Sequence, residues 1–160
     1  MKIIYKKGNL VDATEKVIAH GCNNKGVMNS GVAKAIRENY PEAYSYYMIG
    51  CRTNSLKLGN VIWAPCSGKN FKLIANCITQ DGFGYDSKQY VDYDAVAECM
   101  KEINNGSKIY TEAWPDSESA NFQSFALPKI GAGLGGGDWN IISDIIENEC
   151  DFIQPVVYEL

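Results

Sequence analysis

Five glycines occur within seven residues near the C-terminal end of the sequence, in the stretch LPKIGAGLGGGDW at 127–139. Glycine adopts positive φ angles easily and carries no Cβ, so a phosphate group can approach the peptide N–H groups of such a run. SFALP before the run predicts a strand, and DWNIISDIIENEC after it predicts a helix, whose N-terminus adds free N–H groups and a positive dipole. A strand, a glycine run and a helix in this order predict a pyrophosphate site.

Three other interpretations of the glycine run are a dinucleotide-binding motif, a Walker motif and a tight turn. Gly131, Gly133 and Gly136 match the G-x-G-x-x-G pattern of dinucleotide-binding folds. That pattern belongs in a first βαβ unit, whereas residues 137–160 leave room for only one more helix and one strand. A Walker motif fails because no Lys-Ser or Lys-Thr pair follows the run. A tight turn without a ligand is the remaining alternative, although five glycines exceed what a turn needs.

A second polar loop, HGCNNKGVMNSG at 20–31, also follows an expected strand, KVIAH. Loops at the C-terminal ends of neighbouring strands in an α/β sheet meet at one crevice, so the two loops can clasp a diphosphate from both sides. His20 ends this strand. An unperturbed imidazole titrates near neutral pH, which makes His20 a candidate proton carrier. The alternative is a half-buried histidine bonded to backbone at a strand end.

The elements that must position these loops alternate along the chain, which indicates an α/β fold with a central sheet covered by helices on both faces. Residues 110–124 lack a clear period and predict an irregular excursion. The expected strands are MKIIYK, KVIAH, GNVIWAP, KLIANCI, SFALP and PVVYEL, and the expected helices are VAKAIRENY, PEAYSYYM, DYDAVAECMKEI and DWNIISDIIENEC.

Length and composition narrow the class of protein. A chain of 160 residues with 46% hydrophobic residues fits one compact domain. The net charge of −4 argues against a broad basic surface for duplex nucleic acid. No apolar run approaches the ~20 residues of a membrane span, and the N-terminus lacks a signal-peptide core. Six cysteines without a CxxC pair, and a single histidine, favour a reduced cytoplasmic setting and no metal site.

Several motifs together resemble the macrodomain family, the ADP-ribose-binding α/β/α module. GNLVDA, VIAHGCNNKGVMNSGVAKAI, LGNVIWAP, ALPKIGAGLGGGDW and PVVYEL occur in the order and spacing of that family over nearly the whole chain. The resemblance is to the branch that contains the ADP-ribose 1″-phosphate phosphatases of fungi and phages and the terminal ADP-ribose glycohydrolases. Within this branch, the HGCN element, the short KGVMNSG loop and the closing VYEL are similar to the phosphatases. The resemblance implies a single three-layer α/β/α domain over 1–160, with a mixed, mostly parallel sheet. It also implies a monomer without a cofactor, located in the host cytoplasm if the gene belongs to a phage.

The resemblance also implies a ligand-binding set for ADP-ribose. Asn23 corresponds to the asparagine beside the distal ribose, 26–31 to the loop over the diphosphate, and 130–136 to the loop that cradles the phosphates. Asn9 takes the place of an aspartate that recognises the adenine amino group in many macrodomains, and it can accept that hydrogen bond only without charge. The full set is Asn9, Leu10, Asn23, Lys25, Gly26, Val27, Met28, Asn29, Ser30, Gly31, Val32, Ile130, Gly131, Ala132, Gly133, Leu134, Gly135 and Gly136.

The activity implied by the resemblance is hydrolysis of ADP-ribose 1″-phosphate to ADP-ribose and phosphate, with His20, Asp138 and Asn23 as the expected catalytic residues. His20 would orient the water or protonate the leaving group, and Asp138 would act as a general base. Asp138 is also a good helix N-cap, which is the simpler role. Lys25 and the backbone amides of 26–31 would hold the phosphate, unless Lys25 is a solvated surface charge.

Two other functions stay open. An ADP-ribosyl glycohydrolase would remove ADP-ribose from a protein or a nucleic acid. The related glycohydrolases use a lysine shortly after the strand LIANCIT, whereas this chain has Gln80 and Asp81 there and no lysine before Lys88. A non-catalytic reader of ADP-ribose needs only the two loops.

Overall fold

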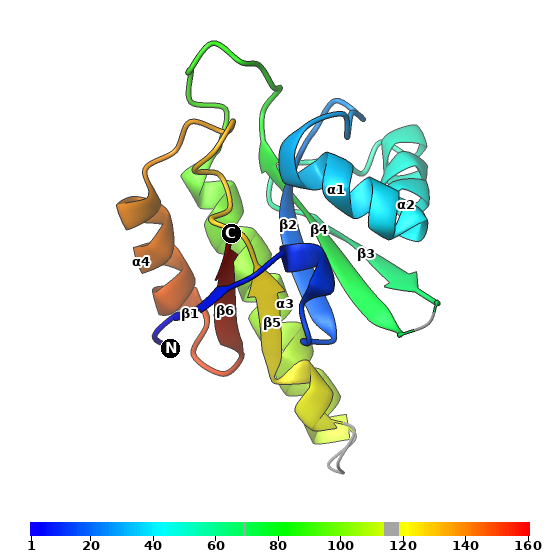
Figure 1. The fold of residues 1–160 in the computed structure, drawn as a ribbon, viewed down its shortest axis with the longest axis vertical. Helices are drawn as coiled ribbons and strands as arrows, with labels where there is room; N and C mark the ends of the chain where they lie inside the picture. The colour runs from blue at the N-terminus through cyan, green and yellow to red at the C-terminus, as the bar shows by residue number, and fades with distance from the viewer. Residues whose placement is uncertain (69, 114–118) are drawn as a thin grey trace.

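The computed structural model describes residues 1–68, 70–113 and 119–160. A six-stranded sheet runs through the centre in the order β1-β6-β5-β2-β4-β3 (Figure 1). Every neighbouring pair is parallel except β3 and β4, so the sheet is mixed and mostly parallel. The strands are β1 (Ile4–Lys7), β2 (Val17–Asn23), β3 (Val61–Cys66), β4 (Lys72–Gln80), β5 (Ser124–Leu127) and β6 (Gln154–Glu159).

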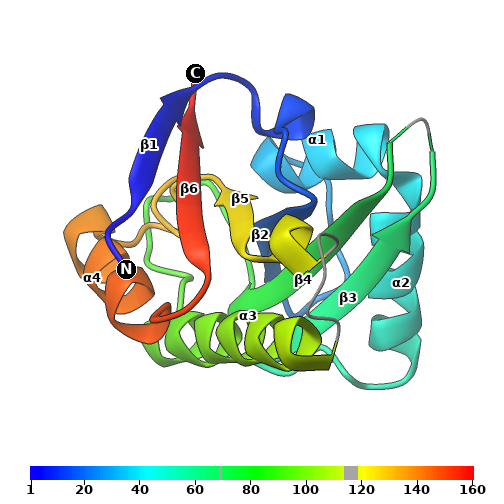
Figure 2. The ribbon, with the colours of Figure 1, turned by 90° about the horizontal axis from the view of Figure 1, so that it is seen from below.

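Helices cover both faces of this sheet (Figure 2). One face carries α1 and α2 and the other carries α3 and α4, which confirms the predicted three-layer α/β/α architecture. The helices are α1 (Gly31–Asn39), α2 (Pro41–Arg52), α3 (Tyr93–Ala113) and α4 (Trp139–Glu149), with short 3-10 helices at Leu10–Asp12 and Ser119–Phe122.

The side chains of β2 show how the two helical layers share the sheet. Val17 and Ala19 pack into the cluster that contains Ile142 of α4, whereas Ile18 packs into the cluster that contains Ile36 of α1. Successive side chains of a strand point to opposite faces, so an uninterrupted apolar run can be buried on both sides. All five of these side chains are buried. The central strands are therefore rigid supports for whatever follows their C-terminal ends.

Two boundaries differ from the expected ones. β2 continues three residues beyond His20, to Asn23, because it still pairs with β4 there. α3 continues to Ala113, so the start of the expected irregular stretch 110–124 is helical. The rings of Tyr110 and Phe122 lie 4.5 Å apart, which packs the 3-10 helix against the last turns of α3. Residues 114–118 of that stretch lie outside the described residues.

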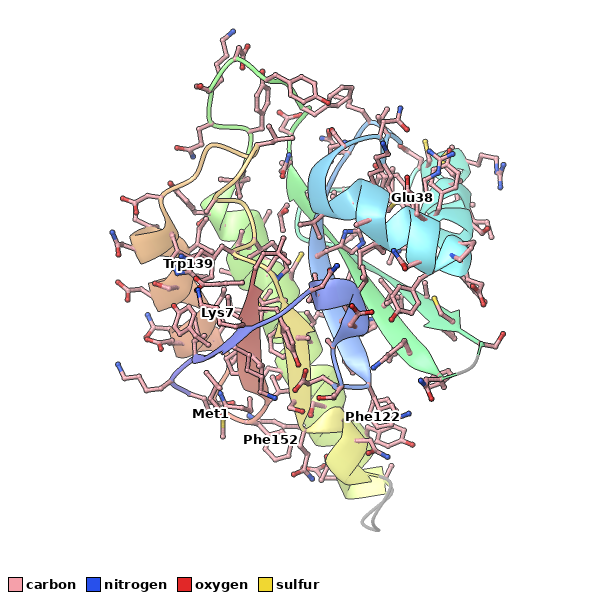
Figure 3. The ribbon with its side chains drawn as sticks, in the orientation of Figure 1. Met1, Lys7, Glu38, Phe122, Trp139 and Phe152 are labelled. Atoms are coloured by element: carbon pink, nitrogen blue, oxygen red, sulfur yellow. The ribbon has the colours of Figure 1, made fainter. Side chains whose placement is uncertain are left out.

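Within the described residues, no helix is long and apolar enough to cross a membrane. Trp139 lies in the first turn of α4, packs against the core on that side and donates its indole N–H to the hydroxyl of Tyr5 at 3.1 Å (Figure 3). This position fits the core role expected for Trp139 rather than a platform for a base.

Candidate functional site

A pocket of ≈ 300 Å³ lies among three loops that follow β2, β5 and β4. These loops lie at the same end of the sheet, at the top of Figure 1. The first loop is residues 24–30, the second loop is residues 128–138 and the third loop is residues 81–92. The expected binding residues that line the pocket are Asn23, Val27, Asn29, Ser30, Gly31, Val32, Ile130, Gly131, Gly133, Leu134 and Gly135.

The first loop is held by side-chain hydrogen bonds. The Asn23 carboxamide donates to the carbonyl of Val27 at 2.8 Å and accepts from the N–H of Lys25 at 2.9 Å. The buried hydroxyl of Tyr47 on α2 accepts from the N–H of Gly26 at 3.0 Å and donates to the carbonyl of Asn23 at 2.7 Å. Asn23 therefore shapes the loop and lines the pocket with the same side chain.

The first loop ends at the N-terminus of α1, which opens into the pocket. Ser30, Gly31, Val32 and Ala33 all line the pocket, and the side chain of the N-cap Ser30 makes no capping hydrogen bond. The first N–H groups of a helix have no partner within the helix and carry a partial positive charge. This wall of the pocket is therefore suited to an anion.

The second loop uses its glycines in two different ways. Gly131 has φ +75, and a Cβ on it would lie 2.6 Å from a methyl carbon of Val91. A Cβ on Gly135 would lie 2.8 Å from the carbonyl oxygen of Gly131. Gly133, in contrast, lines the pocket and has no atom within 4 Å of its Cβ position. Packing requires some of the glycines, and Gly133 leaves open space toward the pocket.

The third loop forms the remaining wall and was missed by the sequence analysis as a binding element. Gln80 at the end of β4 lines the pocket, together with Phe83 and Tyr85. These two aromatic side chains are 48% and 72% exposed, so they do not belong to the core. Two aromatic residues in a polar, glycine-bearing loop were the available signal, since exposed aromatic side chains are typical of ligand-binding surfaces.

The position of His20 gives no support to the expectation that it carries a proton for the reaction. Its side chain is fully buried under α2 and does not line the pocket. Its Nε2 lies 2.6 Å from the carboxamide oxygen of Asn76, whose amide group in turn donates to the carbonyl of Ala43. Burial lowers the pKa of His20 to about 4, so the imidazole is neutral at pH 7. The structure fits the alternative role of a buried histidine in a strand. Its hydrogen-bond partner is the side chain of Asn76 and not a backbone group.

Asp138 also lies outside the pocket lining. It is the N-cap of α4, and its carboxylate accepts from the N–H of Asn140 at 2.9 Å. The capping role of Asp138 therefore fits the structure, and the general-base role finds no support in its position.

Several expected binding residues do not line the pocket. Asn9 caps the first 3-10 helix, Leu10 and Met28 are buried in the core, and the ammonium group of Lys25 lies 3.9 Å from Asp81 at the surface. The others outside the lining are Gly26, Ala132 and Gly136.

The charge of the pocket comes from one side chain. Among the described residues that line it, Lys129 is the only Lys, Arg, Asp, Glu or His. Its ammonium group lies 2.8 Å from a carboxylate oxygen of Glu159, and this hydrogen bond raises the pKa of Lys129. Cys22 also reaches the pocket wall, but burial raises the pKa of its thiol well above the ordinary value, so it is no thiolate nucleophile.

A model of the Macro domain family matches residues 19–146 of this chain. The chain belongs to the macrodomain family. The matched residues run from within β2 through the pocket loops to α4, so they include the whole pocket lining.

Curated relatives of this macrodomain carry different names. It is 30% identical over 163 residues to an ADP-ribose 1″-phosphate phosphatase of Candida albicans, a match that covers 98% of each chain. It is 26% identical to an uncharacterized 17.5 kDa protein of Enterobacteria phage T4, with 99% of this chain and 97% of the phage protein covered. It is also 25% identical to a DNA ADP-ribosyl glycohydrolase of Thermus aquaticus, over 97% of this chain but only 40% of that protein.

Solved structures show the same fold. A protein of unknown function from Bacteroides thetaiotaomicron is 31% identical and superposes with a TM-score of 0.79 over 100% of this chain and 99% of its own. The macrodomain of Mycobacterium tuberculosis DarG, at 21% identity, superposes with a TM-score of 0.78 over 99% of this chain and 97% of its own.

Proposed function

We propose that this macrodomain binds ADP-ribose with its diphosphate between the N-terminus of α1 and the second loop. The observation that carries the proposal is the pairing of two anion-binding walls across one pocket: the free N–H groups at Ser30–Ala33 and the open glycine at Gly133. The pocket contains one cation, Lys129, and no carboxylate among its described lining residues. A doubly charged diphosphate is thus held mainly by backbone N–H groups, because the ammonium group of Lys129 is already paired with Glu159.

We further propose that the bound ligand reacts, and that the reaction is hydrolysis of ADP-ribose 1″-phosphate. The relative from Candida albicans with this activity in its name aligns over almost the full length of both chains. The position after LIANCIT carries Gln80 in the pocket wall, and an amide cannot serve as the covalent lysine of a glycohydrolase.

The chemistry proposed for this pocket relies on hydrogen bonding and charge rather than on an acid–base pair. Hydrolysis of a phosphate monoester needs an oriented water and stabilisation of the charge on the phosphate oxygens. Backbone N–H groups of the first loop and α1 would hold those oxygens. His20 and Asp138 take no part in this scheme, because neither lines the pocket.

Two observations favour other functions, which can be separated by testing three ligands in parallel. The pocket lining lacks a histidine and a carboxylate among its described residues, which favours a non-catalytic reader of ADP-ribose. The relative from Thermus aquaticus is named a DNA ADP-ribosyl glycohydrolase, which favours release of ADP-ribose from a conjugate. Binding to ADP-ribosylated macromolecules belongs to both alternatives. The monomeric state and the cytoplasmic location stay predictions of the sequence.

The deciding experiment gives the purified protein three ligands in parallel. Incubation with ADP-ribose 1″-phosphate should release inorganic phosphate, measured with a colorimetric phosphate assay. ADP-ribosylated protein and ADP-ribosylated DNA should stay intact, measured by gel shift and by chromatography of released ADP-ribose. Binding of ADP-ribose without any turnover would leave the reader function, and release of ADP-ribose from a conjugate would replace the phosphatase by a glycohydrolase. A protein that binds no ADP-ribose would contradict both the binding and the hydrolysis proposals.

A further inference from the structure

Gln80 reaches the pocket because β4 contains an irregularity opposite β2. Cys22 pairs with Ile78, but the next residue of β2, Asn23, pairs with Gln80, so Thr79 is an extra residue in β4. A β-bulge of this kind changes the direction of the side chains that follow it. Strict alternation would place Gln80 on the same face as Asn76 and Ile78, under α2. The bulge turns it toward the loops.

The side chain of Gln80 ends below the second loop. A Cβ placed on Gly135 would lie 3.1 Å from the side-chain oxygen of Gln80, so the absence of a side chain at this position makes room for the amide. The backbone carbonyl of Gln80 also accepts from the N–H of Asn24 at 3.1 Å, which ties the end of β4 to the first loop. Gln80 thus stands where the first, second and third loops meet.

The carboxamide of Gln80 makes no hydrogen bond within the described residues, unlike the other amide side chains nearby. Asn23 donates to Val27, Asn24 donates to Asp81 and Asn76 donates to Ala43. A carboxamide offers two donors and an acceptor, and a partly buried one without a protein partner has its hydrogen-bonding capacity free for water or a ligand. Gln80 lines the pocket.

We propose that the carboxamide of Gln80 orients the water that attacks the terminal phosphate of ADP-ribose 1″-phosphate. This inference rests on the proposed function. Gln80 is paired with Asn23, the residue that the resemblance places beside the distal ribose, and the terminal phosphate is attached to that ribose. The amide oxygen accepts a hydrogen bond from the water while the amide N–H groups donate to a phosphate oxygen, which holds the two reactants together.

The proposed step balances without a change in Gln80. The water oxygen forms a bond to phosphorus, the bond between phosphorus and the 1″ oxygen of the ribose breaks, and the proton that the water loses ends on that ribose oxygen. ADP-ribose and inorganic phosphate leave, and the neutral amide is unaltered. Because an amide does not titrate near neutral pH, loss of Gln80 lowers the rate without changing the shape of the pH profile.

The test replaces Gln80 by methionine, which has a similar length but cannot make these hydrogen bonds. We expect kcat for phosphate release by Gln80→Met to fall at least about ten-fold, while the Kd for ADP-ribose, which lacks the terminal phosphate, stays within about two-fold. Gln123→Met serves as the matched control, because Gln123 is exposed next to β5, at the opposite end from the pocket, and this variant should keep the wild-type kcat. Thermal unfolding of all three proteins checks that they are folded.

Each outcome of this test is informative. Wild-type kcat in folded Gln80→Met would overturn the role of Gln80 and leave the phosphatase proposal standing. An equal loss of kcat and of ADP-ribose affinity would also overturn it, since Gln80 would then bind the ligand without acting on the water. Absence of phosphate release by the wild-type protein would overturn the proposed function and this inference together.

Discussion

The first and second loops both border the pocket, but different forces hold them in place. The first loop depends on polar side chains below it, because Asn23 and Tyr47 fix its backbone. The second loop depends on close backbone packing. A Cβ on Gly136 would collide with the carbonyl oxygen of Lys88, and one on Gly137 would lie 2.6 Å from a methyl carbon of Val91.

This difference shows that only some glycines of a glycine-rich loop leave space for a ligand, while the others are needed for packing. In the second loop, most glycines let the loop pack against residues 88–91 of the third loop, and the N–H groups of Tyr90 and Val91 donate to the carbonyl of Gly135. Gly133 alone among the five has an empty Cβ position. Substitutions in the two loops should therefore separate effects on stability from effects on binding.

The largest effect is expected in the second loop, for Gly136→Ala. Gly136 has φ +71, which an L residue adopts at a cost of about 1–2 kcal/mol, and the new Cβ would overlap the carbonyl of Lys88. With the displacement of the third loop included, we expect the free energy of unfolding to fall by about 3 kcal/mol. Urea denaturation measures it. Gly133→Ala is the matched control and should stay within about 0.5 kcal/mol of wild type; equal effects at the two positions would contradict the comparison.

The next effect concerns His20 in β2 and depends on pH. His20 has a pKa of about 4 in the folded protein and 6.5 as its ordinary value, so the unfolded chain binds more protons between these pH values. The stabilising effect of the buried neutral imidazole is complete above pH 6.5 and is lost as the pH falls toward 4. We expect the free energy of unfolding to fall by about 2 kcal/mol between pH 7 and pH 5, as measured by urea denaturation at each pH.

The variant His20→Gln should flatten this pH dependence above pH 5, because a glutamine does not titrate. It should also retain phosphate release, since His20 does not line the pocket. Complete loss of phosphate release in folded His20→Gln would show that His20 takes part in the reaction.

Gly133→Val tests the part of the second loop that faces the ligand. The two methyl groups would enter the empty space next to the proposed diphosphate and should weaken ADP-ribose binding at least about ten-fold, or about 1.4 kcal/mol, by isothermal titration calorimetry. The melting temperature should change little. Gly68→Val is the matched control, because Gly68 also has no atom near its Cβ position and lies outside this pocket. Unchanged affinity in Gly133→Val would remove the diphosphate from this wall.

The smallest effect is expected for Tyr47→Phe, which removes one hydroxyl below the first loop. The N–H of Gly26 loses its acceptor and the carbonyl of Asn23 loses a donor, so the free energy of unfolding should fall by about 1 kcal/mol in urea denaturation. Tyr46→Phe on the same helix is the control, since Tyr46 is 41% exposed. A neutral Tyr47→Phe variant would mean that side chains do not hold the first loop.

The sequence predicted the sheet and both glycine-bearing loops because these features leave local patterns. Apolar runs mark β2, β4 and β5, and the glycine run from Gly131 to Gly137 follows one of them directly. The third loop escaped prediction because an irregular segment has no period. Its packing against the second loop, where Lys88 approaches Gly136, and its place in the pocket wall both depend on contacts between segments far apart in the sequence.

The burial of His20 could not be predicted from such local patterns. Gly21, Cys22 and Asn23 have the composition of a loop, which predicts a strand that ends at His20, whereas pairing with β4 extends it to Asn23. The extension places the imidazole inside a regular strand, opposite Asn76. The capping role of Asp138 can be predicted from the sequence, because a helix N-cap is a local feature and an aspartate directly before WNIISDII provides it.

By itself the sequence determined the alternation of strands and helices, the macrodomain family and the two loops that follow β2 and β5, since each of these depends on neighbouring residues along the chain. Only the tertiary structure decided which side chains face the pocket. The direction of a side chain at the end of a strand depends on pairing with a distant strand, as at His20, or on a bulge such as the one before Gln80. No local pattern in the chain specifies that pairing.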